Sequence, residues 1–306
     1  MDFDSGNIVR PHRLKPGDTI GIVAPAGPFD QDRFAQGIAV VESMGFAVHI
    51  DERIFARLGY LAGTDRERAA HFNAVVADNR VKAVLCARGG YGTLRMLDSV
   101  DYAAVVAAAK PIIGFSDITA LHRAVYLRSR LVTFHGPMVA TLGQSDQASR
   151  LRWHQVLTET VAPPLALDTA RVLNPGTAQG VLVGGNLATL CHLLGTGLGA
   201  GYRGCIVLLE EIGEPLYRID RMLVQMKMAG LFAGMAGLLL GGFQDCGPQE
   251  DIECLIEEIF RGWDIPIVSG LPVGHGLNNW TIPLGITVRM DTSQRQLCFV
   301  DPTFQE

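Results

Sequence analysis

The sequence has little charge, no paired-cysteine motif and no long apolar run, and each absence excludes a class of protein. Charged residues make up 19% of the 306 residues and the net charge is −5, without any run of five basic residues. A phosphate-binding surface needs clustered Lys and Arg, so we expect no nucleic-acid partner. The most apolar run, at 235–243, is too short to cross a bilayer, so we expect no membrane association.

Cysteine and histidine are present, but without the spacing that metal sites or disulfide frameworks use. The six cysteines form no CxxC pair and most lie in apolar runs, which is typical of buried, reduced thiols. The eight histidines show neither HxH nor HExxH spacing, so we expect no metal and no cofactor. The first residues lack a basic stretch followed by an apolar one, as a secretion signal would have. Together these features predict a cytoplasmic location.

The chain does contain a hydrophobic fraction of 48%, which fits a well-packed globular protein. Its length favours two domains. In the first half, short apolar runs alternate with segments of helical periodicity, which predicts a parallel sheet covered by helices. The second half is richer in strand patterns and ends in two alternating segments, ITVRM and QLCFV, that indicate an antiparallel hairpin.

These patterns predict an α/β fold with two domains. Residues 1–150 are expected to form an N-terminal parallel-sheet domain of the Rossmann or flavodoxin-like type. Residues 176–306 are expected to form a C-terminal, β-rich α/β domain. The stretch between them, 151–175, is polar and contains prolines, and we expect it to be a linker.

Three loops follow predicted strands of the first half: 24–28, 88–92 and 114–117. In a parallel sheet the carboxyl ends of the strands lie at one edge, and ligands bind beyond that edge. We therefore expect the three loops to meet and to contribute to a functional site.

Ser116 stands between a predicted strand, PIIGF, and a predicted helix that begins at Asp117. A serine on a sharp strand-to-helix turn exposes its hydroxyl, and the NH groups at the helix start point toward an incoming oxyanion. The segment GFSDI resembles a nucleophile elbow, but Ile118 stands where the GxSxG pattern has its second glycine. The alternative is that Ser116 only caps the helix.

The loop 88–92, RGGYG, follows the predicted strand VKAVLCA. Adjacent glycines let a backbone approach a ligand closely and donate its NH groups. One interpretation is a phosphate cradle, although the loop lacks the spacing of both GxGxxG and the P-loop. A second interpretation is half of an oxyanion hole that faces Ser116, and a third is a tight turn without a further role.

Two acidic residues and two histidines complete the set of candidates. Glu210 and Glu211 end the predicted strand CIVLLEE, where a carboxylate leaving a buried strand needs a partner unless the strand end is exposed. His275 lies between two glycines in LPVGHG, so little crowds its ring. His135, which follows the strand LVTF, is its rival, and either histidine could instead be structural.

A serine, a histidine and a carboxylate at strand ends are the parts of a catalytic triad, which is defined by geometry and role rather than by chain order. The serine hydroxyl is a weak nucleophile until a base takes its proton. A histidine can take that proton and later give it to the leaving amine, while the carboxylate holds the ring in one tautomer. Backbone NH groups stabilise the oxyanion, by about 3–4 kcal/mol for each donor.

Five segments together resemble the serine LD-carboxypeptidase family, which also contains the microcin C immunity peptidases. They are LKPGDTIGIVAPAGP, ARGGYG, GFSDIT, the LEE…YRIDRML segment at 209–223, and GLPVGHG, and the likeness covers roughly residues 10–300. Glu211 remains an alternative for the acid of the triad. The resemblance implies a role for each of five residues: Ser116 as nucleophile, Glu210 as orienting acid, His275 as base, and the NH groups of Gly90 and Asp117 as oxyanion donors.

The resemblance also implies a homodimer that takes part in peptidoglycan recycling. The typical substrate of the family is the murein tetrapeptide, cut between the L-centre of its diamino acid and the terminal D-Ala. This substrate carries a free carboxylate, and Arg88, with Gly89 beside it, is our candidate for binding it.

The immunity branch of the family acts on aminoacyl-nucleotide-like substrates and would need an aromatic platform for the base. Trp153 is the first candidate by position, ahead of Trp263 and Trp280. Since no aromatic-rich insertion occurs at 140–180, we favour the murein branch.

The sequence is also compatible with two other functional classes. A nucleotide-binding Rossmann-like enzyme would use the GGYG loop for a phosphate, and loss of Ser116 would then be harmless. A non-catalytic peptide-binding module would exchange a bound peptide slowly without turnover.

Overall fold

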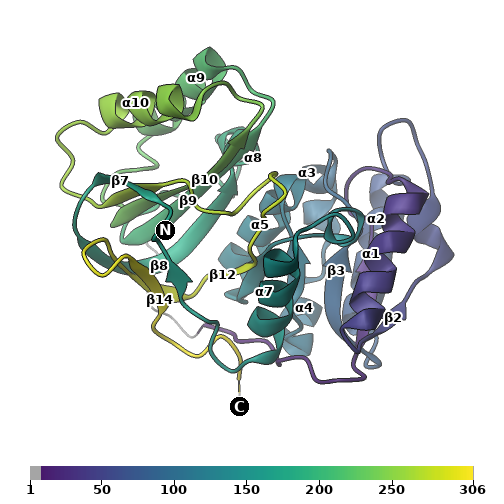
Figure 1. The fold of residues 1–306 in the computed structure, drawn as a ribbon. Helices are drawn as coiled ribbons and strands as arrows, with labels where there is room; N and C mark the ends of the chain where they lie inside the picture. The colour runs from purple at the N-terminus through teal and green to yellow at the C-terminus, as the bar shows by residue number, and fades with distance from the viewer. Residues whose placement is uncertain (1–7, 306) are drawn as a thin grey trace.

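The computed structural model describes residues 8–305 and contains two sheets that lie side by side (Figure 1). The first sheet has six strands: β1 (Thr19–Val23), β2 (Ala47–His49), β3 (Val81–Cys86), β4 (Ile112–Gly114), β5 (Thr133–His135) and β12 (Ile282–Leu284). Their order is β12-β5-β4-β3-β1-β2. Strands β1 to β5 are parallel, as predicted, whereas β12 comes from the C-terminal part of the chain and pairs antiparallel to β5.

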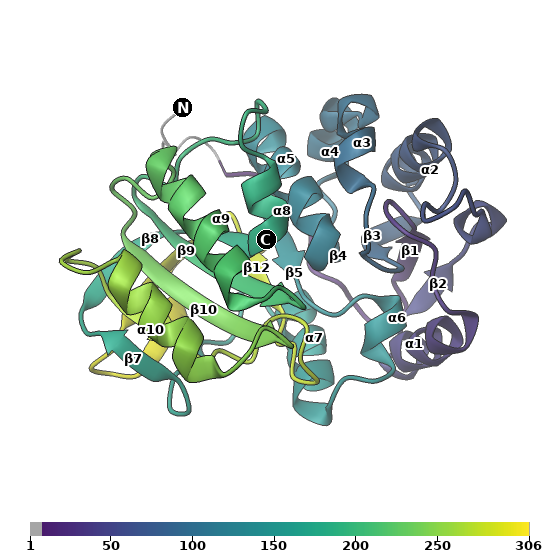
Figure 2. The same ribbon diagram turned by 90° about the horizontal axis from the view of Figure 1, so that it is seen from above.

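Helices cover both faces of this sheet (Figure 2). One face carries α1 (Gln31–Ser43), α6 (Val139–Leu142) and α7 (Gln147–Thr158). The other carries α2 (Asp65–Ala77), α3 (Thr93–Met96), α4 (Tyr102–Ala108) and α5 (Thr119–Ser129). Three short 3₁₀ helices lie between these elements: η1 (Glu52–Phe55), η2 (Leu97–Ser99) and η3 (Ser116–Ile118).

The second sheet has eight strands: β6 (Leu165–Ala166), β7 (Arg171–Asn174), β8 (Thr177–Asn186), β9 (Cys205–Ile212), β10 (Gly237–Gln244), β11 (Ile267–Ser269), β13 (Thr287–Asp291) and β14 (Gln296–Phe299). Their order is β6-β14-β13-β8-β9-β10-β11-β7. Strands β8 to β11 form a parallel core, and antiparallel strands flank it on both sides. The predicted hairpin of the tail is confirmed as β13 paired with β14.

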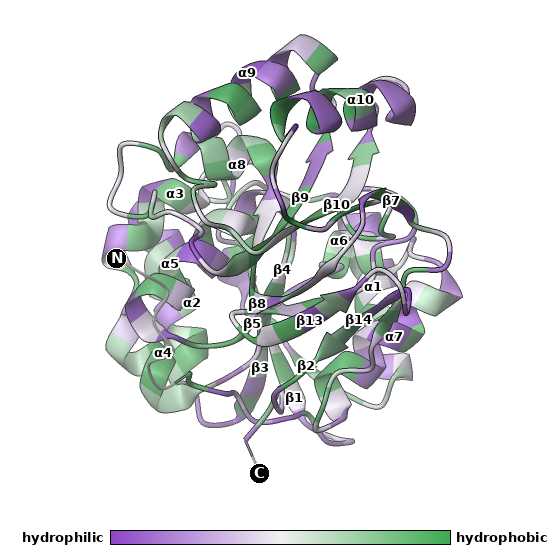
Figure 3. Ribbon diagram, turned by 90° about the vertical axis from the view of Figure 1, so that its left-hand side faces the viewer, coloured by the Kyte–Doolittle hydropathy of each residue, from purple (hydrophilic) through white to green (hydrophobic). Residues whose placement is uncertain are grey.

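Three helices accompany this sheet: α8 (Leu187–His192), α9 (Leu216–Met228) and α10 (Gln249–Ile259). Figure 3 shows hydrophilic and hydrophobic residues alternating around α9 and α10, as expected of helices with one face on a core. Ile219, Leu223 and Met226 form the buried stripe of α9.

The stretch 151–175 differs from the expected linker, because most of it is regular structure. It contains the end of α7 and the two edge strands β6 and β7 of the second sheet. Its polar composition reflects elements with one exposed side, while Trp153 on α7 is completely buried. Since β12 also crosses to the first sheet, the domain boundaries at 150 and 176 stay a prediction.

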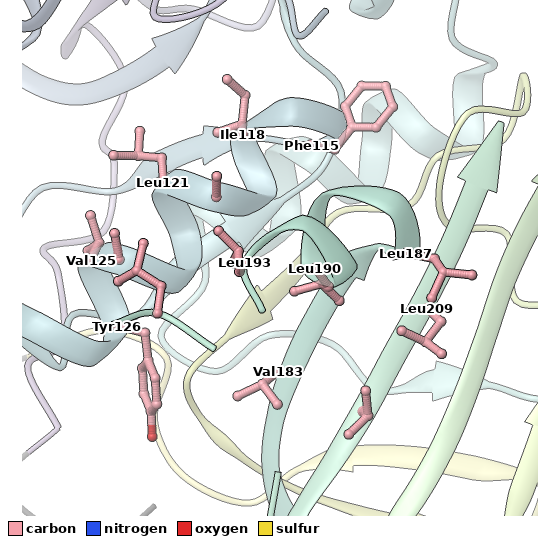
Figure 4. Close-up of a cluster of buried hydrophobic side chains, with 14 of the residues drawn as sticks. Phe115, Ile118, Leu121, Val125, Tyr126, Val183, Leu187, Leu190, Leu193 and Leu209 are labelled. Atoms are coloured by element: carbon pink, nitrogen blue, oxygen red, sulfur yellow. The ribbon is translucent and has the colours of Figure 1, made fainter. Parts of the chain in front are cut away.

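One apolar cluster joins the two halves of the chain (Figure 4). Phe115 and Ile118, at the start of the α5 region, share it with Leu187, Leu190 and others from the second half. Completely burying such a side chain contributes about 1.5–3 kcal/mol. The cluster therefore fixes the turn that follows β4 against strands β8 and β9. Within residues 8–305, no helix is both long and apolar enough to cross a membrane.

Candidate active site

Ser116 lies on a strained turn. Its φ angle is 63°, in the left-handed region, which costs a non-glycine residue about 1–2 kcal/mol. The helix predicted from Asp117 begins as the 3₁₀ turn η3, and α5 follows from Thr119. Ile118, which departs from the GxSxG pattern, is buried, and a Cβ on Gly114 would lie 2.8 Å from its Cγ2 atom. Here the glycine that permits the turn therefore precedes the serine.

The three loops expected at one sheet edge do meet there. Gly27 N donates to Gly89 O over 3.1 Å, which joins the loops 24–28 and 88–92. A Cβ placed on Gly89 would lie 3.0 Å from Ser116 Cβ and 3.2 Å from Ser116 Oγ. Glycine at position 89 thus lets the backbone of this loop pass directly beside the serine hydroxyl.

Asp117 ties the glycine loop to the serine turn. Its carboxylate Oδ2 accepts a hydrogen bond from Thr93 N, at the start of α3, over 2.8 Å. Burial raises the pKa of the Asp117 carboxyl above its ordinary value. The backbone NH groups of Gly90 and Asp117 donate to no other residue in 8–305. Both are therefore without a protein acceptor, as oxyanion donors must be before substrate binds.

Glu210 and His275 form the second part of the site. His275 Nδ1 and Glu210 Oε2 are 2.7 Å apart, and Glu210 is completely buried at the end of β9. Gly274 has φ +122°, and a Cβ there would lie only 2.7 Å from Glu210 Oε2. A glycine before the histidine is thus required for the imidazole to reach the carboxylate. Because Nδ1 faces Glu210, the Nε2 atom is left for proton transfer.

Phe115 connects the two parts. Its ring centroid lies 4.8 Å from that of His275, and its backbone is directly bonded to Ser116. Among residues 8–305, Ser116 Oγ has no hydrogen-bond partner, so the serine and the histidine share one region without a direct bond. No sequence pattern indicates this role, because a phenylalanine at a strand end is typical of core packing.

The neighbouring acids, between which the sequence could not decide, have different partners. Glu211 accepts hydrogen bonds from Asn186 Nδ2 (2.7 Å), Ala188 N (2.6 Å) and Ile212 N (2.9 Å). Burial raises its pKa. Glu211 therefore satisfies the start of α8, while Glu210 is the one that meets the histidine ring.

Three other candidates lie away from this arrangement or at its margin. His135 is completely buried, neither ring nitrogen has a partner within residues 8–305, and burial lowers its pKa well below 6.5. Trp153 is completely buried in the core, so its prediction as an aromatic platform is wrong. Arg88 is exposed, and its Nη1 atom donates to Pro28 O over 2.8 Å, which places it beside the loop 24–28.

Known families match both halves of the chain. The N-terminal domain of LD-carboxypeptidases matches residues 20–136, and the C-terminal domain of LD-carboxypeptidases matches residues 179–290. The chain belongs to the LD-carboxypeptidase family. It is accordingly a serine carboxypeptidase, a hydrolase with a parallel-sheet N-terminal part and a β-rich C-terminal part.

Relatives and solved structures agree with this membership. The murein tetrapeptide carboxypeptidase of Pseudomonas aeruginosa is 32% identical over 89% of this chain and 92% of the relative. A Bacillus subtilis protein named "probable murein peptide carboxypeptidase" is 36% identical over 94% and 92%. The muramoyltetrapeptide carboxypeptidase of Oxalobacter formigenes superposes with a TM-score of 0.78 at 28% identity, covering 91% of this chain and 97% of that one.

A member of the immunity branch is also among the proteins to which the chain is similar. The microcin C7 self-immunity protein MccF of Escherichia coli is 26% identical over 325 aligned residues, which cover 94% of this chain and 94% of the relative. Its structure in the wild-type apo state has a TM-score of 0.89 at 23% identity, covering 97% of this chain and 99% of that one. At that identity the structural likeness shows the shared fold alone.

Proposed function

We propose that the chain is an LD-carboxypeptidase that removes the terminal D-Ala from murein tetrapeptides through an acyl-enzyme. The observation that carries the proposal is the 2.7 Å contact between His275 Nδ1 and buried Glu210, next to the turn that bears Ser116. The names of the Pseudomonas and Oxalobacter relatives support this substrate. The enzyme would work in the cytoplasm, where its free cysteines stay reduced, as a homodimer on recycled peptides.

In the proposed first step, Ser116 Oγ attacks the carbonyl carbon of the L-centre of the diamino acid. His275 Nε2 takes the hydroxyl proton, and the carboxylate of Glu210 stabilises the imidazolium that results. The carbonyl oxygen becomes an oxyanion and accepts hydrogen bonds from the NH groups of Gly90 and Asp117. Collapse of this intermediate breaks the amide bond, and His275 gives its proton to the amine of the departing D-Ala.

In the second step, water hydrolyses the ester on Ser116. His275 Nε2 takes a proton from the water, whose oxygen attacks the acyl carbon. The proton then returns to Ser116 Oγ, and the tripeptide leaves with a new carboxylate. Arg88 and the Gly89 backbone, beside the nucleophile, would hold a carboxylate of the substrate.

The test is the release of D-Ala from L-Ala-γ-D-Glu-meso-diaminopimelyl-D-Ala. We expect release by the wild-type enzyme and none above background by the Ser116→Ala variant. Equal release by both proteins, or none by either, would contradict the proposal. The same pair of proteins incubated with an aminoacyl sulfamoyl adenosine tests the immunity-type alternative, for which cleavage of that compound in preference to the peptide is the expected sign.

A further inference from the structure

The loop that carries His275 is held by a helix from a distant part of the chain. Asn279, four residues beyond the histidine, is 3% exposed, and its Oδ1 atom accepts a hydrogen bond from Gly274 N over 3.1 Å. Asn279 N in turn donates to Ser149 Oγ on α7 over 3.0 Å. Ser149 is completely buried, and its own NH is bonded to Asp146 Oδ1 at the start of that helix.

The hydrogen bond from Gly274 N to Asn279 holds the glycine that packs against Glu210, the acid of the proposed triad. Gly274 has a positive φ of 122° and lies against Glu210 Oε2, so a small rotation of its peptide would move the imidazole relative to the carboxylate. Two further hydrogen bonds close the loop: Trp280 N donates to Pro272 O over 2.7 Å, and Arg152 Nε donates to Thr281 O over 3.0 Å. The backbone of 272–281 is thus anchored at both ends. The peptide between Val273 and Gly274 is held on its two sides, because Asn279 Oδ1 accepts from its NH and Gly242 N donates to its carbonyl, Val273 O, over 2.8 Å.

We propose that Asn279, held by Ser149 of α7, is a positioning residue that sets the orientation of His275. This inference rests on the proposed function, in which His275 is the base. Its physical reason is that a base displaced by about 1 Å can lose about a hundredfold in rate even though the substrate still binds. Of the two polar atoms of the Asn279 side chain, only Oδ1 makes a hydrogen bond, because Nδ2 is buried without a partner among residues 8–305.

The unused Nδ2 atom makes the inference specific. An aspartate at this position keeps an oxygen for Gly274 N, and because burial favours its neutral, protonated form, a hydroxyl takes the place of the unpartnered Nδ2 group. An alanine, by contrast, removes the acceptor. Asn278, the preceding residue, is exposed on the same loop and provides a matched control.

The experiment compares D-Ala release and thermal unfolding for the wild type and four variants. We expect Asn279→Ala to lower kcat about tenfold to a hundredfold with KM within about twofold. Asn279→Asp should restore kcat to within about threefold of the wild type, Ser149→Ala should lower it less than Asn279→Ala, and Asn278→Ala should leave it unchanged. If Asn279 only stabilises the fold, both Asn279 variants should yield less folded protein, in proportion to their loss of stability. The kcat of each folded molecule should then be unchanged.

Several results would overturn the inference. They are an unchanged kcat in Asn279→Ala, an Asn279→Asp enzyme as slow as Asn279→Ala, or a fall in kcat in Asn278→Ala equal to that in Asn279→Ala. If Asn279→Ala does not fold, Asn279→Asp and Ser149→Ala decide by the same criteria. If the wild type releases no D-Ala, it is the proposed function that fails, and the rate at which a phosphonofluoridate labels Ser116 in each variant then decides the inference on the same scale.

Discussion

The two sheets contribute to the site in different ways. On the first, Ser116 is placed by backbone geometry: it has a φ of 63°, and a glycine loop passes so close that a Cβ on Gly89 would lie 3.0–3.2 Å from its side chain. On the second, Glu210 and His275 are placed by a side-chain hydrogen bond and by the close approach of Gly274. The position of the nucleophile thus depends on local conformation, whereas the positions of the acid and the base depend on contacts between distant segments.

We expect the largest effect from removing the nucleophile Ser116, which the first sheet contributes to the site. Ser116→Ala and Ser116→Gly should each lower kcat/KM at least about 10⁴-fold, because the attacking oxygen is gone. Only Ser116→Gly relieves the left-handed strain, so it should be more stable to unfolding than Ser116→Ala by about 1 kcal/mol. Chemical denaturation and D-Ala release measure the two effects. A glycine variant less stable than the alanine variant would show that the turn is not strained.

The second prediction separates the adjacent acids. Glu210→Gln should lower kcat about 10⁴-fold, because an amide no longer stabilises the imidazolium or fixes its tautomer. Glu211→Gln cannot accept all three of its hydrogen bonds, so it should lose about 1–3 kcal/mol of stability while kcat stays within about tenfold. Kinetics and urea unfolding of both variants give the comparison. The reverse pattern would assign the acid of the triad to Glu211.

The third prediction contrasts the two histidines. His135 stays neutral in the folded state, since burial lowers its pKa well below 6.5, whereas it protonates near 6.5 when unfolded. Below pH 6.5 the unfolded chain therefore binds more protons, and stability falls as the pH falls. Each such group contributes a slope of up to about 1.4 kcal/mol per pH unit.

His135→Leu should reduce the slope of unfolding free energy against pH below pH 6.5 by up to about 1.4 kcal/mol per pH unit. Its kcat should stay within a few-fold of the wild-type value. Unfolding free energies from pH 7 to pH 5, with D-Ala release at pH 7 as the control, test both statements. Loss of turnover in His135→Leu with a normal melting temperature would instead favour His135 as the base.

The smallest expected effect concerns Arg88. Its exposed guanidinium can turn from Pro28 O to a substrate carboxylate, so Arg88→Ala should raise KM about tenfold, with kcat little changed. Steady-state kinetics on the tetrapeptide measures the change, with Arg80→Ala, an exposed arginine paired to Asp78, as the control. An unchanged KM would remove Arg88 from the substrate site.

Much of the first sheet could be predicted from the sequence, because its signals are local. The strands and the meeting of the three loops follow from short patterns, and the structure confirms both. The start of the α-helix after Ser116 could not be predicted, since the residues at 116–118 are compatible with either a 3₁₀ turn or the first turn of an α-helix.

The rest required tertiary contacts. The stretch 151–175 is predicted to be a linker because it is polar and contains prolines. Its strands nevertheless complete the second sheet, and Arg152 on α7 donates to Thr281 O in the loop that follows His275. Trp153 is the first candidate by position for the aromatic platform of the immunity branch, but its burial depends on which face of α7 meets the core, and that face cannot be read from its position alone. No local pattern joins Ser149 to Asn279, which lie 130 positions apart in the chain.

A crystal structure of the Ser116→Ala enzyme with the bound tetrapeptide would show whether the serine turn and the Glu210–His275 pair act on one scissile bond. We predict that the carbonyl oxygen of the scissile bond lies about 3 Å from the NH groups of Gly90 and Asp117. Its amide nitrogen should face His275 Nε2, with the carbonyl carbon about 3–3.5 Å from where Ser116 Oγ would stand. A peptide bound with its scissile bond remote from both Gly90 and His275 would contradict the account.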